Sequence, residues 1–245
     1  MKRSSTMQWF GPLWLVLTFV ALGIGLYEAA TAPREATMGD LYRVFFYHFP
    51  HTILSFVWPY VNCFASLAYL FLRDRNKQRA QAADALAVAS AEATVLYASI
   101  GLATGMLWGR AAWGIWWAWD ARLTTYLLLW LLYVSYLIVR RFSAGGQTAL
   151  IAAVLAIFAA VDIPICFESI RWWRTQHPAP VFGGGEDAGI DKSMVPAVLW
   201  NVGAWLMWGL LIIGVRYVVE RRKQRFQDAT AMDFLNGGDD TAEAA

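Results

Sequence analysis

Six long apolar windows constrain this chain more than any other feature of its sequence. An α-helix needs roughly 20 residues to cross the ~30 Å hydrocarbon layer of a membrane. Only 16% of the 245 residues are charged, against about 25% in an ordinary soluble domain. The sequence therefore predicts an all-α membrane protein with six transmembrane helices. The windows cover residues 9–27, 52–72, 85–107, 123–139, 149–167 and 196–219.

The distribution of basic residues predicts which side of the membrane each connection faces. Six spans place both termini on one side. The two terminal segments and the connections 73–84 and 140–148 hold twelve Lys and Arg residues, whereas the other connections hold seven, offset by eight acidic residues. Because short cytoplasmic loops carry the excess of Lys and Arg, we expect both termini to be cytoplasmic. The outer loops would then be 28–51, 108–122 and 168–195.

One membrane domain is expected over residues 1–225. Residues 226–245 end in Gly, Asp, Ala and Glu and are expected to form a disordered cytoplasmic tail. The net charge of +2 provides no basic field for nucleic acid. Neither Cys63 nor Cys166 belongs to a C-x-x-C pair, so the sequence offers no redox dithiol or zinc ribbon. We expect both cysteines to pack as small side chains.

A cluster of tryptophans occupies one predicted outer loop. It is either an interfacial aromatic belt or a rigid apolar shelf for a flat ligand. A belt spreads one or two tryptophans over each helix end, so a single continuous cluster favours the shelf. Asp120 is expected to cap the helix that begins near Leu123, while Arg122 either binds a carboxylate or phosphate or anchors the helix end. The tryptophans are Trp108, Trp113, Trp116, Trp117 and Trp119.

All three histidines also lie in predicted outer loops. His48 and His51 precede the second apolar window, and His177 follows the fifth. A shared face makes joint ligation possible, although a histidine near the interface is also an ordinary polar anchor. His48 and His51 are spaced to chelate one ion together, but no Cys, Asp or Glu stands beside them to complete a zinc site.

Two acidic residues, Glu92 and Asp162, fall inside apolar windows. Ionisable groups are costly in hydrocarbon and are candidates for function. Glu92 is expected to pair with the basic connection 73–84. Asp162 stands two residues before Pro164, whose missing N–H frees a carbonyl, and is expected to face a polar pocket near the outer surface. A purely structural role stays equally open for both.

Three segments together resemble a known protein family. The run WGIWWAWDARLT at 113–124 is similar to the tryptophan-rich "WWD" signature of the haem-handling proteins of cytochrome c biogenesis. Tyr42-Arg43 with YHFP at 47–50, and WWRTQH at 172–177, resemble the histidine segments of one family, haem exporter protein C, also called cytochrome c maturation protein C. The order of the segments, the six spans and the length agree with that family along nearly the whole chain.

The resemblance implies a haem carrier of the bacterial cytoplasmic (inner) membrane rather than a conventional enzyme. Its iron ligands would be His48 and His177, and haem b would be held non-covalently, since the sequence has no C-x-x-C-H. Arg122 and Arg43 would meet the propionates. The periplasmic shelf would comprise Trp113, Trp116, Trp117, Trp119 and Asp120.

The same resemblance implies partners. Haem would pass to a periplasmic haem chaperone, with ATP-binding cassette transporter subunits and a small single-span membrane subunit assisting its release. Two residues depart from the family pattern, because Gln176 and Pro178 replace the usual leucine and glutamine around the second histidine. His51 is a rival ligand.

Two other function classes compete with the carrier. A bis-histidine b-type membrane oxidoreductase usually places its histidines within the spans, whereas here all three fall outside the apolar windows. A small-molecule transporter would use Glu92, Asp162 and Pro164 at the midplane, but paired broken helices or inverted repeats are not evident. The carrier is therefore favoured.

Overall fold

The computed structural model describes residues 5–143, 146–178 and 189–242, and its regular elements over these ranges are all helical. Six segments are long and apolar enough to cross a membrane, with α5 and α6 together forming the fifth. The predicted six-span all-α fold is thus confirmed. The elements are α1 (Ser5–Thr31), η1 (Asp40–Val44), α2 (Phe45–Leu72), α3 (Lys77–Trp113), α4 (Ala121–Phe142), α5 (Thr148–Ala160), α6 (Asp162–Trp172), η2 (Lys192–Met194) and α7 (Val195–Ala242).

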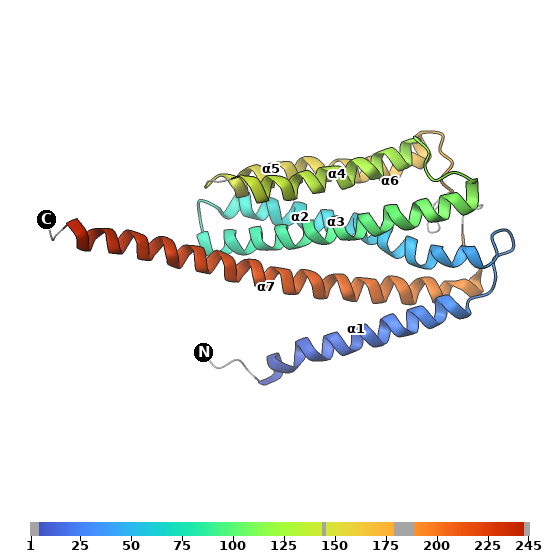
Figure 1. Ribbon diagram of the computed structural model, residues 1–245, viewed down its shortest axis with the longest axis horizontal. Coiled ribbons are helices and arrows are strands. Elements are labelled where there is room, and N and C mark those ends of the chain that lie inside the picture. Colours follow the sequence, from blue (N-terminus) through green and yellow to red (C-terminus); the bar gives the residue numbers. More distant parts are fainter. Residues whose placement is uncertain (1–4, 144–145, 179–188, 243–245) are drawn as a thin grey trace.

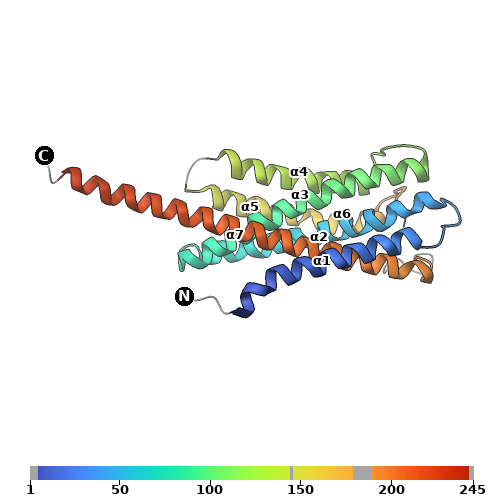
Figure 2. The same ribbon diagram turned by 60° about the horizontal axis from the view of Figure 1, so that its bottom comes forward.

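The spans lie side by side as an elongated bundle with α2 and α3 at its centre (Figure 1). Helices α4, α5 and α6 pack on one side of this central pair, α7 packs on the other, and α1 packs mainly against α7 (Figure 2). The start of α1 and the end of α7 lie at the same end of the bundle, as an even number of spans requires (Figure 1). Which side of the membrane that end faces stays a prediction.

Small side chains let the central helices approach closely. The buried face of α3 includes Ala89, Ala93 and Ala98, each fully shielded from solvent. Small residues at helix interfaces in membranes allow close backbone approach and so strengthen van der Waals packing. Aromatic rings fill the space on the facing helices, where Trp58 and Tyr133 are among the largest fully buried side chains.

Ion pairs and a hydrogen bond from a glutamine amide connect α3 to its neighbours. Glu92 pairs with Arg216 of α7, with the Arg216 Nη2 2.5 Å from its Oε1. The expectation that Glu92 pairs with the connection 73–84 is wrong, because the long α3 places this residue well inside the bundle opposite α7. Asp84 accepts from Arg140 Nη2 at 3.0 Å and from Gln224 Nε2 at 3.1 Å, which joins α3, α4 and α7.

The break between α5 and α6 holds the other intramembrane acid. Asp162 is the first residue of α6, and its Oδ2 atom is buried without a hydrogen-bond partner. The break follows Val161, three residues before Pro164, whose ring cannot donate a backbone hydrogen bond. A polar pocket around Asp162 stays a prediction.

Two helices begin or end elsewhere than the apolar windows indicate. Helix α2 begins at Phe45, so His48 and His51 lie on its first turns and not, as expected, in a loop. Phe45 and Phe46 are buried against α1 and α7, and this packing stabilises turns that hydropathy alone does not detect. Helix α3 continues to Trp113, where Gly114 ends it with a left-handed backbone conformation (φ 75°).

Helix α7 continues to Ala242, while the division into a membrane domain over residues 1–225 and a tail over 226–245 stays a prediction. Contacts with α3 support this helix as far as Asp228. Asp228 accepts a hydrogen bond from Gln81 Nε2 at 2.7 Å and pairs with Lys77 at 3.1 Å. The residues after Asp228 include good helix formers such as Ala, Met and Leu.

Candidate ligand-binding site

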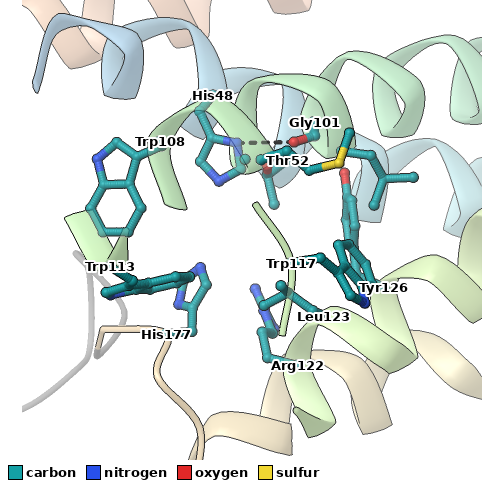
Figure 3. A pocket seen from close by; sticks show the side chains of 13 residues that line it. His48, Thr52, Gly101, Trp108, Trp113, Trp117, Arg122, Leu123, Tyr126 and His177 are labelled. Carbon is teal, nitrogen blue, oxygen red and sulfur yellow. Dashed lines mark hydrogen bonds between the residues drawn. The ribbon is translucent and has the colours of Figure 1, made fainter. Parts of the chain in front are cut away.

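A cavity of about 50 Å³ lies at the end of the bundle opposite the chain termini, where α2, α3 and α4 meet the segment 173–178 that follows α6 (Figure 3). Figure 3 shows His48 and His177 on opposite sides of this cavity with both rings directed into it. The fold therefore brings together the two histidines that the family resemblance paired. The lining residues are His48, Thr52, Gly101, Leu102, Gly105, Met106, Trp108, Trp113, Trp117, Arg122, Leu123, Tyr126 and His177.

His48 is oriented by the backbone of α3. Its Nδ1 atom lies 3.1 Å from the Gly101 carbonyl oxygen and 3.2 Å from Thr104 Oγ1. A carbonyl can only accept, so Nδ1 carries the proton and the other ring nitrogen keeps its lone pair. A backbone carbonyl is a common partner for the second nitrogen of a metal-binding histidine.

One of three regularly spaced glycines makes room for this histidine. Gly101, Gly105 and Gly109 recur every fourth residue and so lie along one face of α3. A Cβ atom at Gly105 would lie 3.0 Å from His48 Cε1, and one at Gly101 would collide with the Tyr126 hydroxyl. The imidazole therefore rests directly on the α3 backbone.

His177 lies on an irregular segment that Asp120 holds. Asp120 Oδ1 caps α4 by accepting from Leu123 N at 2.9 Å, which confirms the predicted cap. Asp120 Oδ2 accepts from Thr175 Oγ1 at 2.6 Å and from Gln176 N at 3.2 Å. The His177 amide in turn donates to Thr175 Oγ1 at 3.1 Å.

The chemistry of His177 resembles that of His48. Its Nδ1 atom lies 2.9 Å from the Pro178 carbonyl oxygen, which leaves the lone pair of the other ring nitrogen to coordinate a metal. Burial lowers the pKa of His177 to about 4, and the positive charge of Arg122 acts in the same direction. The imidazole is therefore neutral at physiological pH, as ligation requires.

Arg122 brings a buried positive charge to the cavity. Its Nη1 atom donates to the Cys166 carbonyl at 2.5 Å, and its guanidinium lies 5.2 Å from the centre of the Phe56 ring. None of the ion pairs within the described ranges includes Arg122. A buried cation without a counter-ion favours an anionic ligand.

The tryptophan cluster divides into two groups. Trp108, Trp113 and Trp117 line the cavity, and the indole Nε1 atoms of Trp108 and Trp117 are buried with no hydrogen-bond partner among the residues that the structure describes. Trp116 and Trp119 are 56% and 77% exposed and do not line it. The division follows from Gly114, which ends α3 and leaves 115–120 irregular.

Arg43 and His51 also lie outside the cavity lining. Arg43 donates to the Ala29 carbonyl at 2.6 Å and pairs with Asp40 at 3.3 Å. His51 is buried, with its ring 4.3 Å from that of Trp205 on α7. Each side chain already has neighbours elsewhere in the bundle.

The cavity also contains residues that sequence reasoning missed, such as Thr52, Met106 and Tyr126. Two signals for this wall were present in the sequence. Thr52 follows His48 by one helical turn, and the three glycines of α3 repeat at intervals of four.

Comparison with known proteins agrees with the sequence resemblance. Residues 2–230 match the family model described as Heme exporter protein C. A relative of that name from Bradyrhizobium diazoefficiens is 36% identical over 218 residues, covering 86% of this chain and 80% of its own. The namesake from Haemophilus influenzae is 32% identical (87% and 85% covered), and that from Escherichia coli K12 is 30% identical (81% and 78% covered).

Proposed function

Because the chain belongs to the heme exporter protein C family, we propose that it binds haem b at the outer face of the bacterial cytoplasmic membrane. It then delivers this haem to a periplasmic haem chaperone during the biogenesis of c-type cytochromes. One observation carries the proposal: two histidines distant in the sequence direct their imidazoles into a single cavity.

The iron is bound axially by His48 and His177. In both rings Nδ1 faces a backbone carbonyl, so the remaining nitrogen is the ligand. Within the part of the chain that the structure describes, no three His, Cys, Asp or Glu side chains gather as a metal site. A metal held by two histidines therefore needs its equatorial ligands from elsewhere, and a porphyrin supplies four.

The porphyrin's negative edge is met by one buried cation and two buried indole donors. Arg122 provides the charge, and the indole N–H groups of Trp108 and Trp117 provide buried donors. Propionates bind such donors by charge-assisted hydrogen bonds. Arg43, already paired with Asp40, is left out of this site.

The size of the cavity bears on loading and release. Ligand pockets commonly measure roughly 300–1,000 Å³, whereas this cavity measures about 50 Å³. The walls must therefore separate to admit a macrocycle. The His177 segment is the wall that moves at least cost, because residues 174–178 are irregular and are held by a few side-chain hydrogen bonds to Asp120 and Thr175. A carrier benefits from such reversible ligation.

The partners follow from the same function. An ATP-binding cassette pair and a small single-span subunit assist release of the loaded chaperone. Exposed Trp116 and Trp119, which do not line the cavity, either sit at the membrane interface or meet the acceptor.

Haem titration of the detergent-purified protein tests the proposal. We expect His48→Ala and His177→Ala each to weaken haem binding by at least about 10-fold, since even outer-shell changes at metal sites cost that much. Both variants should also transfer less haem to a purified chaperone. His51→Ala is the matched control, because His51 lies outside the cavity lining. Wild-type affinity in both site variants would refute the ligand assignment.

A further inference from the structure

We propose that Asp120 is a positioning residue for His177, acting through Thr175 and not through contact with haem. The inference rests on the proposed function and adds a mechanism to it. Asp120 fixes the segment that carries one axial ligand to the first turn of α4, the helix that carries Arg122.

The hydrogen bonds form a continuous path from α4 to the ligand. Leu123 N donates to Asp120 Oδ1 at 2.9 Å, which holds the carboxylate at the helix end. Thr175 Oγ1 and Gln176 N donate to Oδ2 at 2.6 and 3.2 Å. The same Thr175 oxygen accepts from the His177 amide at 3.1 Å.

His177 depends on this path more than His48 depends on any side chain. His48 lies on α2 and rests against the α3 backbone, so two helices fix its position. The residues around His177 are irregular, and their local hydrogen bonds must supply the orientation. Bonds to a carboxylate are roughly twice as strong as neutral ones, which suits Asp120 to this task.

A direct role for Asp120 in haem binding is disfavoured by its surroundings. Both carboxylate oxygens already accept from protein donors, three in all. Its negative charge would also repel a propionate that approaches Arg122. Asp120 does not line the cavity, whereas Trp117, Arg122 and His177 do.

Two substitutions separate positioning from simple helix capping. Asp120→Asn keeps an oxygen that accepts from Leu123 N, but its amide nitrogen cannot accept from Thr175 or Gln176. Thr175→Val leaves the cap untouched and removes the shared hydroxyl, whereas Thr175→Ser restores it. Thr125→Val is the matched control, since the Thr125 Oγ1 hydrogen bonds to the Ala121 and Arg122 carbonyls lie within α4 and do not reach the His177 segment.

Hydrogen exchange in the ligand-free protein gives a readout that needs no haem. We expect the amides of Gln176 and His177 to exchange faster in Asp120→Asn and Thr175→Val than in the wild type. Thr175→Ser and Thr125→Val should exchange like the wild type. Unchanged exchange in both Asp120→Asn and Thr175→Val would overturn the proposal.

Haem-loaded protein gives the second readout. We expect Asp120→Asn and Thr175→Val to show a high-spin fraction and about 10-fold faster haem dissociation, with added imidazole restoring the low-spin spectrum. If both match the wild type while His177→Ala loses its low-spin spectrum, Asp120 serves only as a cap. If His177→Ala also keeps that spectrum, the ligand assignment fails, and the exchange result alone decides whether Asp120 holds the segment.

Discussion

Replacing Gly105 by alanine tests how closely His48 is fitted to α3. The new Cβ atom would lie 3.0 Å from His48 Cε1 and 3.5 Å from its Nδ1, so the ring must shift by a few tenths of an ångström. The Nδ1–Gly101 distance is already 3.1 Å, near the long end of about 3.2 Å for such bonds. The shift therefore breaks this hydrogen bond and rotates the other ring nitrogen of His48 away from the position in which it would bind iron.

The size of the effect follows from that bond. A typical hydrogen bond contributes about 0.5–1.5 kcal/mol, so haem affinity should fall by about 2- to 13-fold. Stability should fall by no more than about 2 kcal/mol, because the gain of about 1 kcal/mol from Gly to Ala in a helix partly offsets a steric cost of about 1–3 kcal/mol. Haem titration by absorbance and thermal unfolding by circular dichroism measure the two effects separately.

Gly203→Ala is the control for this substitution. Gly203 lies in α7, and a Cβ atom there would meet nothing within 4 Å. We expect it to leave haem affinity unchanged and to raise stability slightly. If Gly105→Ala bound haem as tightly as the wild type, with the same spectrum, His48 would not be held on α3 as described.

Three further substitutions give distinct results. Arg122→Gln should weaken haem binding by about 1.5–3 kcal/mol, the range for a charged hydrogen bond; equal loss for a porphyrin lacking propionates would contradict the role of Arg122 in binding them. Trp117→Ala should lower haem affinity more than Trp116→Ala, because only Trp117 lines the cavity; equal effects in a titration would argue for a simple belt. Glu92→Gln should lower stability by about 1–3 kcal/mol, because it leaves Arg216 without its carboxylate partner, and it should preserve haem affinity. Thermal unfolding measures the stability and titration measures the affinity; weaker haem binding would link this ion pair to the site.

The features predicted correctly from the sequence are those that local composition determines. Hydropathy detects the six spans because the membrane requires long apolar helices whatever their packing. The cap at Asp120 follows from its place before an apolar run. The joint placement of His48 and His177 came from the family resemblance, since no local pattern links residues so distant in the chain.

Features that depend on tertiary packing could not be predicted in this way. The early start of α2 results from burial of Phe45 and Phe46 against α1 and α7, and a hydropathy window along one segment does not detect contacts between separate helices. Glu92 of α3 pairs with Arg216 of α7 because these two helices pack against each other in the bundle. The division of the tryptophans follows from one glycine, Gly114, whose left-handed backbone ends α3 within the cluster.

Electron paramagnetic resonance of the ferric haem complex tests the central claim most directly, because the signal reports the axial ligands of the iron. For the wild type we predict a low-spin, bis-imidazole signal, replaced by a high-spin signal in His48→Ala and in His177→Ala. A high-spin wild-type complex, or a bis-imidazole signal that persists in either variant, would contradict the account.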